Sequence, residues 1–160
     1  MDKTEYIIRE LWKSEYPLLD DFLYEAIFIP EGVEPPPREI IKQPELQVYI
    51  KGFGEGEWDN ALLAEVNGQP VGAVWVRIMN DYGHIDDSTP SFAISLYKKH
   101  RSKGIGTALM RAMLERLKSK GCKQASLAVQ KQNYAVKMYK NVGFEIVGEN
   151  EEEYIMLCRL

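Results

Sequence analysis

Between residues 91 and 120, a predicted strand leads through a basic turn with two glycines into a predicted amphipathic helix. The helix shows apolar residues at helical spacing from Ile105 to Leu117, and Gly121 is placed to end it. The first amides of a helix have no partner within the helix, and the helix dipole is positive there. Gly104 and Gly106 would let a ligand approach the backbone closely. The arrangement therefore predicts an anion site, above all a phosphate site, at residues 101–106.

Two well-known phosphate-binding loops do not fit this segment. A dinucleotide-binding fingerprint needs a third glycine at position 109, which is Leu109 here. A P-loop needs a terminal Gly-Lys-Ser or Gly-Lys-Thr, which the sequence lacks. What remains is the pattern R-x-x-G-x-G, formed by Arg101, Gly104 and Gly106. Taken alone, this pattern also fits a simple helix-entry turn, and the basic run at residues 98–103 also fits a solvated charged surface.

The order of the predicted elements indicates a mixed α/β or α+β domain. Apolar periodicity predicts helices at residues 14–28 and 38–53, with Ser14 as the N-cap of the first and an interruption near Pro44 in the second. Asn67 and Gly68 lie between two apolar segments and predict a β-hairpin. The other predicted elements are strands at residues 5–11, 61–66, 71–79, 91–97, 124–129, 144–147 and 153–158, and helices at residues 104–120 and 133–141.

Length, charge and cysteine content narrow the class of protein. The 160 residues fit one domain with one core, residues 1–160, and the net charge of −4 does not favour a nucleic-acid partner. The sequence has no apolar run long enough to span a membrane and no apolar signal core near Met1. Cys122 and Cys158 lack metal-ligand spacing and fit two buried free thiols, although the sequence leaves a disulfide open. We therefore expect a cytoplasmic protein with no membrane partner and no metal.

A second pattern lies downstream of the basic turn and consists of Asn133, Ala135, Tyr139, Gly143 and Phe144. The two patterns, which together cover roughly residues 92–145, resemble the GNAT superfamily of N-acetyltransferases. The resemblance implies a mixed, mostly antiparallel central sheet of about six to seven strands flanked by about four helices. It also implies that strands four and five splay apart to hold acetyl-CoA.

The resemblance assigns residues to the binding of acetyl-CoA, the implied cosubstrate, and implies no metal. The splayed strand would pair with the pantetheine arm, and the amides of the turn would bind the pyrophosphate. Arg101 and Lys103 would add positive charge, with Lys98 or Lys99 assisting at the 3′-phosphate, and Asn133 would bind the pantetheine arm or a water near it. The implied cofactor-binding residues are Ile94, Ser95, Leu96, Arg101, Ser102, Lys103, Gly104, Ile105, Gly106, Thr107 and Asn133.

The resemblance implies a general acid for the reaction but assigns no general base. Tyr139 is implied as the general acid for the leaving thiol, since a neutral phenol can donate a proton to a thiolate. Many relatives carry a glutamate at the start of the splayed strand, where this chain has Ser91. The loop at residues 81–87 also fits a merely solvated segment. Its residues that could replace the glutamate, directly or through water, are Tyr82, His84, Asp86 and Asp87.

The expected activity is transfer of an acetyl group from acetyl-CoA to a primary amine of a small molecule or peptide, by direct attack. Neither cysteine lies near the motifs, which agrees with a reaction that forms no acyl-enzyme. Two alternatives stay open. A coenzyme A-binding sensor without catalysis is favoured slightly by the missing glutamate, and a nucleic-acid protein would use the basic run at residues 98–103. A homodimer is a further expectation from the family.

Overall fold

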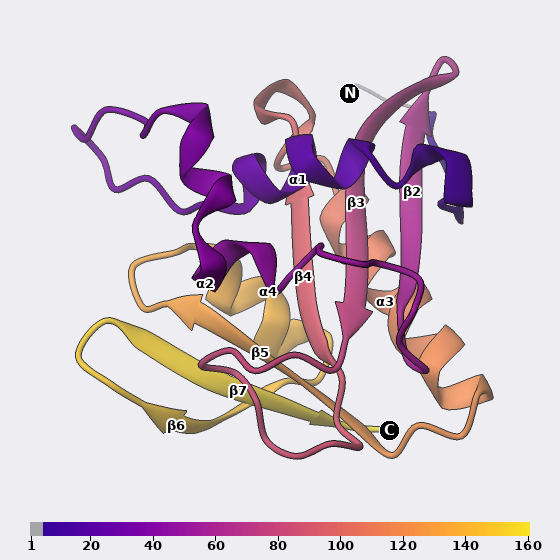
Figure 1. Ribbon diagram of the computed structural model, residues 1–160, viewed down its shortest axis with the longest axis vertical. Helices are drawn as coiled ribbons and strands as arrows, with labels where there is room; N and C mark the ends of the chain where they lie inside the picture. The colour runs from indigo at the N-terminus through magenta and orange to yellow at the C-terminus, as the bar shows by residue number, and fades with distance from the viewer. Residues whose placement is uncertain (1–4) are drawn as a thin grey trace.

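The computed structural model describes residues 5–160, which form a seven-stranded sheet in the order β1-β2-β3-β4-β5-β7-β6 (Figure 1). All neighbouring strands are antiparallel except β4 and β5, which are parallel. The predicted mixed, mostly antiparallel sheet is therefore confirmed. The strands are β1 (Ile7–Glu10), β2 (Asn60–Val66), β3 (Gln69–Arg77), β4 (Ser91–Leu96), β5 (Gln124–Gln130), β6 (Glu145–Glu149) and β7 (Glu153–Arg159).

Helices cover both faces of the sheet (Figure 1). One face carries α1 (Leu18–Ala26), the 3₁₀ turn η2 (Arg38–Lys42) and the short α2 (Pro44–Gln47). The opposite face carries α3 (Ile105–Ser119) and α4 (Ala135–Asn141).

The core follows the alternation of side chains along the central strands. Ala73 and Trp75 of β3 point into the cluster beneath α1, whereas Val74 and Val76 point into the cluster beneath α3. All four are fully buried. The β2–β3 hairpin turns at Asn67 and Gly68, whose φ angles of 53° and 76° fit the predicted hairpin and confirm it.

The N-terminal helical segments differ from their predictions. Ser14 is not a helix N-cap, because residues 13–15 form a separate 3₁₀ turn, η1 (Lys13–Glu15), and α1 begins at Leu18. Pro17 precedes α1, and its missing N–H is harmless there because first-turn amides have no intrahelical partner. The predicted helix at residues 38–53 is broken into η2 and α2 by Pro44, with turns following α2.

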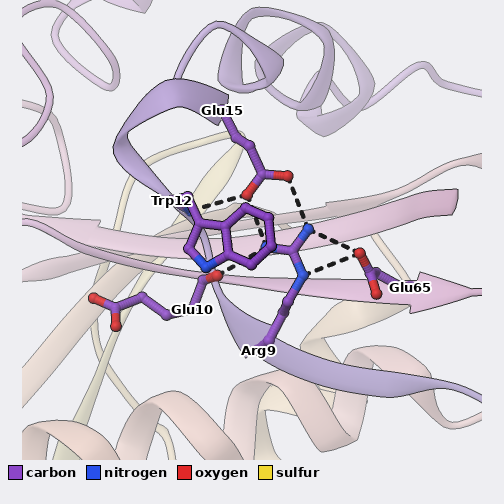
Figure 2. Close-up of polar contacts among 5 residues, drawn as sticks. All are labelled: Arg9, Glu10, Trp12, Glu15 and Glu65. Atoms are coloured by element: carbon purple, nitrogen blue, oxygen red, sulfur yellow. Dashed lines mark hydrogen bonds and ion pairs between the residues drawn. The ribbon is translucent and has the colours of Figure 1, made fainter. Parts of the chain in front are cut away.

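Arg9 fastens β1 and the turn η1 to β2 at the edge of the sheet (Figure 2). Its guanidinium donates to the Glu15 carboxylate at 2.7 and 2.8 Å and to the Glu65 carboxylate at 3.0 and 2.8 Å. The guanidinium carbon also lies 4.0 Å from the centre of the Trp12 ring. Hydrogen bonding to Arg9 holds the pKa of the Glu15 carboxyl below its usual value. This network is structural and lies at the opposite edge of the sheet from β5, β7 and β6.

Candidate active site

The two parallel strands at the middle of the sheet touch at one end and separate toward the other. Ser91 and Ser126 are the single residue pair that joins β4 to β5 within residues 5–160. The Ser126 N–H donates to the Pro90 carbonyl at 3.0 Å at this closed end. Beyond it, β4 continues beside β3 and β5 continues beside β7. The sheet therefore contains a V-shaped opening between residues 92–96 and 127–130, as predicted.

The alternation of backbone groups along β4 shows which residues face this opening. The Tyr97 N–H donates to the Val71 carbonyl of the β3 side at 2.9 Å. In an antiparallel ladder alternate residues bond to the same neighbour, so the backbone groups of Ile94 and Leu96 point away from β3 and into the opening. Ser95 differs, since its buried hydroxyl donates to the Phe22 carbonyl at 2.6 Å and fastens α1 to β4.

The turn after β4 has the backbone conformation that the glycine pattern suggested. It begins with the 3₁₀ turn η3 (Lys98–His100) and contains two left-handed residues, Ser102 at φ 61° and Gly104 at φ 86°. A left-handed non-glycine residue is strained by about 1–2 kcal/mol, which marks Ser102 as a functional candidate. No atom lies within 4 Å of the position that a Gly104 Cβ would take, so the turn is open to a ligand.

The amides at the start of α3 are available to an anion. The first α-helical hydrogen bond of α3 runs from the Ala108 N–H to the Gly104 carbonyl at 3.1 Å, and no side chain caps the helix. The N–H groups of Ile105, Gly106 and Thr107 precede this bond and therefore lack intrahelical partners. Ile105 and Gly106 are buried, and Thr107 is half-buried. A Cβ on Gly106 would lie 3.2 Å from a Leu96 methyl, so this glycine lets α3 start close to β4.

Among the charged residues of the turn, Arg101 has a structural role, whereas the three lysines are exposed. Arg101 donates to the Leu96 carbonyl at 2.9 Å and contacts Glu25 at 3.4 Å, so it fastens the turn to β4 and α1. Its side chain is still 34% exposed and adds charge at the site. Lys98, Lys99 and Lys103 are exposed.

Tyr139 lies on α4 on the same face as α3. Its ring packs edge-on against Phe144, with centroids 6.2 Å apart, and only 8% of the residue is exposed. Its hydroxyl has no hydrogen-bond partner within the described part of the chain. Burial raises the pKa of Tyr139, so the phenol stays protonated and can donate.

Asn133 precedes α4 and supports it. Its side-chain oxygen accepts the Ala135 N–H at 2.9 Å, which caps the helix. Its amide nitrogen has no hydrogen-bond partner among residues 5–160 and can still donate to a ligand.

The loop between β3 and β4 supplies the polar groups at the closed end of the opening. Ser91 is fully buried, and its hydroxyl pairs with that of Ser126 at 3.2 Å, so it does not replace the expected glutamate. The exposed Asp86 accepts from Ser88 and Thr89 within its own turn, at 2.8 Å each. Asp87 has a 97% exposed side chain.

The other two candidate bases of the loop, His84 and Tyr82, are not buried groups with a free side chain either. His84 Nδ1 lies 3.0 Å from the Met79 carbonyl, and Tyr82 is 40% exposed. A residue that sequence reasoning passed over, Asp81, is instead half-buried and accepts from the Tyr49 hydroxyl at 3.1 Å. No local pattern connects these two, because they are 32 residues apart.

A cleft of about 380 Å³ lies beside the end of β5 that is distant from its contact with β4. Phe28 and Pro30 line it from the segment after α1, and residues 130–132 line it from the end of β5. Glu151 and Glu152, from the β6–β7 turn, complete its wall. Lys131 also lines the cleft but is ion-paired with Glu149 at 2.9 Å, so the carboxylates of Glu151 and Glu152 favour a positively charged ligand.

Three further observations concern the described residues. Cys122 and Cys158 are buried free thiols, as the sequence suggested. No group of three or more His, Cys, Asp and Glu side chains within residues 5–160 is arranged to hold a metal ion. No helix of the described chain is long and apolar enough to cross a membrane.

Comparison with known sequences identifies relatives for most of the chain. N-acetyltransferase 8 of Mus musculus is 32% identical over 103 residues, which cover 64% of this chain and 44% of the mouse protein. An uncharacterized N-acetyltransferase of Methanocaldococcus jannaschii is 30% identical over 146 residues, which cover 88% of this chain and 61% of that protein. The chain thus spans about half the length of these curated relatives.

Comparison of structures extends the likeness to the whole fold. The PaiA N-acetyltransferase of Thermoplasma acidophilum, solved in complex with coenzyme A, superposes with a TM-score of 0.71 at 19% identity. The match covers 98% of this chain and 99% of that chain. The sequence model of the acetyltransferase (GNAT) family matches residues 8–144, which include the β4 turn and Tyr139. The resemblance noted from the sequence is therefore confirmed, and this chain belongs to the acetyltransferase (GNAT) family.

Proposed function

We propose that this protein transfers an acetyl group from acetyl-CoA to a primary amine of a small molecule or peptide, by direct attack. The observation that carries the proposal is the opening between β4 and β5, which ends at the unpaired amides of α3. The membership of the family and the coenzyme A complex of the Thermoplasma acidophilum protein support acetyl-CoA as the cosubstrate.

The residues present fit the diphosphate and pantetheine parts of acetyl-CoA. The left-handed Ser102 and Gly104 leave open space around the turn, and the amides of residues 105–107 can donate to phosphate oxygens. Arg101 and Lys103 add positive charge. The backbone groups of Ile94 and Leu96 can bond to the amides of the pantetheine arm, as a neighbouring strand would. The arm would therefore run from the wide end of the opening toward its closed end.

Acetyl-CoA supplies a thioester whose carbonyl carbon accepts a nucleophile and whose sulfur leaves as a thiolate. Tyr139 would donate a proton to that sulfur, because burial keeps its phenol neutral and its hydroxyl has no partner in the described chain. Backbone N–H groups of β4 in the opening would stabilise the negative charge that develops on the carbonyl oxygen. Asn133 would hold the arm through its free amide nitrogen.

The amine would enter from the cleft bounded by Phe28, Pro30 and the two glutamates of the β6–β7 turn. This cleft lies on the side of α1, whereas the phosphate turn leads into α3 on the other face.

We place the reaction in the cytoplasm, since both cysteines are free thiols, and we treat residues 1–160 as one catalytic domain.

The proposal is tested by measuring thiol release from acetyl-CoA with a panel of primary amines that includes diamines, amino acid amides and peptides with free N-termini. We expect saturable turnover with at least one of these classes. Binding of acetyl-CoA without amine-dependent thiol release across the panel would contradict the proposal and favour a coenzyme A sensor. Mass spectrometry of the protein after incubation with acetyl-CoA alone would reveal an acyl-enzyme, which direct attack excludes.

A further inference from the structure

We propose that Asp81 is the general base of this reaction and takes the proton from the ammonium group of the acceptor. The inference rests on the proposed acetyl transfer to an amine. It answers the question that Ser91 leaves open, because the glutamate expected at the start of β4 is absent.

The loop that carries Asp81 is fastened at the closed end of the opening. The Ser126 hydroxyl, which pairs with Ser91, donates to the Gly83 carbonyl at 2.8 Å. The loop backbone lies against β5 so closely that a Cβ on Gly83 would be 3.1 Å from the Ala128 nitrogen. The same Cβ position is 3.4 Å from a carboxylate oxygen of Asp81. The carboxylate is therefore placed next to β5, just past the last contact between β4 and β5.

The backbone groups of Ala128 face the opening, and this places the neighbouring Asp81 near the expected position of the thioester. The Lys131 N–H donates to the Glu152 carbonyl at 2.8 Å, so the odd-numbered residues of β5 bond on the β7 side. The even-numbered residues, Ala128 among them, turn their backbone groups toward β4. A pantetheine arm that starts at the wide end would bring its thioester to this level.

Tyr49 fixes the carboxylate and lies on the acceptor side of the sheet. The Trp75 indole N–H donates to the Tyr49 carbonyl at 3.0 Å, and Trp75 pairs with Ala93 of β4. The Tyr49 backbone is thus held on the α1 face of the sheet beside Trp75, whose partner Ala93 is two residues past the closed end. Arg77 donates to the Lys51 carbonyl at 2.8 Å and holds the same segment.

The environment of Asp81 suits a base. One carboxylate oxygen accepts from Tyr49, and the other is buried without a hydrogen-bond partner among the described residues. Burial raises the pKa of the Asp81 carboxyl above its ordinary value, and the bond from Tyr49 partly offsets this. The titratable groups that face it are Tyr49 from the segment after α2, His84 from its own loop and Glu153 from β7. A raised pKa makes the carboxylate a stronger proton acceptor than a solvated aspartate.

Glu153 connects this position with the proposed entry of the amine. Its pKa is raised by burial and by the neighbouring charges of Glu152 and Asp81. Glu152 lines the cleft, so acidic groups extend from the cleft wall to Asp81. The chemistry fits an acceptor that arrives as a cation.

The proton balance of the step is complete. Asp81 takes one proton from the ammonium group, and the neutral nitrogen forms the C–N bond to the thioester carbon. The C–S bond breaks, and the sulfur keeps the electron pair. The second proton of the nitrogen is lost to the sulfur through Tyr139, and Asp81 releases its proton to solvent. The products are the N-acetylated amine, the free thiol of coenzyme A and one proton.

The test compares wild type with Asp81→Asn and with Asp20→Asn, which makes the same chemical change at an exposed residue of α1. The acceptor is a peptide with a free N-terminus or an amino acid amide, because both carry an α-amino group. For each protein, kcat/KM for the amine is measured at pH 7 and above pH 9, where an α-amino group is already neutral. Thermal unfolding and acetyl-CoA calorimetry check that each variant is folded and binds its cosubstrate.

We expect Asp81→Asn to lower kcat/KM by about a hundredfold or more at pH 7, with Asp20→Asn within twofold of wild type. The deficit should shrink at least tenfold above pH 9, because a neutral amine needs no base. A deficit below threefold at pH 7, or one that is equal at both pH values in a folded variant, would overturn the inference while the proposed function stands. Wild type that binds acetyl-CoA but acetylates no amine would overturn both.

Discussion

Tyr139→Phe removes one oxygen atom from a buried ring and separates catalysis from stability. The ring contact with Phe144 is kept, and the lost hydroxyl has no hydrogen-bond partner in the described chain. Burying an unpartnered hydroxyl costs about 1–3 kcal/mol, so the variant should be as stable as wild type or more stable by about 1 kcal/mol. For a chain of 160 residues, that gain is about 2–4 °C in Tm.

The catalytic effect of the same change should be large. Loss of a proton donor to the leaving sulfur should lower kcat by about 10²–10⁴-fold, which is about 3–5 kcal/mol of transition-state stabilisation. The Kd for acetyl-CoA should change less than threefold, because the ring and the phosphate turn are unchanged.

The assay combines thiol release, titration calorimetry with coenzyme A and thermal unfolding. Tyr134→Phe is the matched control, since it makes the same change at a residue that is 70% exposed, five positions earlier in the chain. A Tyr139→Phe enzyme with wild-type kcat would remove Tyr139 from the chemistry. A variant that loses several degrees in Tm would instead show that the hydroxyl is structurally bonded.

Three other predictions use the same purified protein. Gly104→Ala, at φ 86°, should cost about 1–2 kcal/mol of stability and weaken acetyl-CoA binding in calorimetry. Gly121→Ala, at φ 85° beyond the other end of α3, should cost the same stability and leave acetyl-CoA binding unchanged. Arg77→Met should destabilise by about 3–5 kcal/mol in denaturant titrations, because the 2% exposed carboxylate of Asp59 loses its only cationic partner among the described residues and keeps only the N–H groups of Gly54 and Gly56; a loss below 1 kcal/mol would contradict this. Asp81→Asn should be more stable than wild type at pH 7, since burial disfavours the charged carboxylate. The gain should fall as the pH falls through the raised pKa of folded Asp81 and vanish below about pH 3, where Asp81 is protonated in both the folded and unfolded states; a pH-independent difference in Tm would refute the cause.

The parts of the fold that were predictable are those set by local chemistry. Asn67 and Gly68 encode their turn because both accept positive φ, and Gly104 marks the entry to α3 for the same reason. The unpaired amides after it follow from helix geometry alone. Ser14 misled the N-cap prediction because Pro17 allows α1 to start three residues later than a capped helix would.

The polar groups of the acceptor side could not be predicted, because they are assembled from distant segments. Asp81 meets Tyr49 only after the segment that follows α2 is bonded to Trp75 of β3, and Ser126 holds Gly83 only after β5 reaches β4. From the sequence alone, without these partners, the charged loop at residues 81–87 cannot be distinguished from a solvated loop. The same holds for Arg101, whose bond to the Leu96 carbonyl appears only when the turn folds back on β4.

The central claim is that the opening between β4 and β5 and the turn before α3 hold acetyl-CoA. It is tested most directly by following backbone amide resonances of the ¹⁵N-labelled protein during a titration with acetyl-CoA. We predict saturable shifts at Ile94, Leu96 and residues 104–107, with a common Kd. Shifts absent there, or confined to the smaller cleft beside Trp58 and Cys122 at the start of β5, would contradict the assignment of the site.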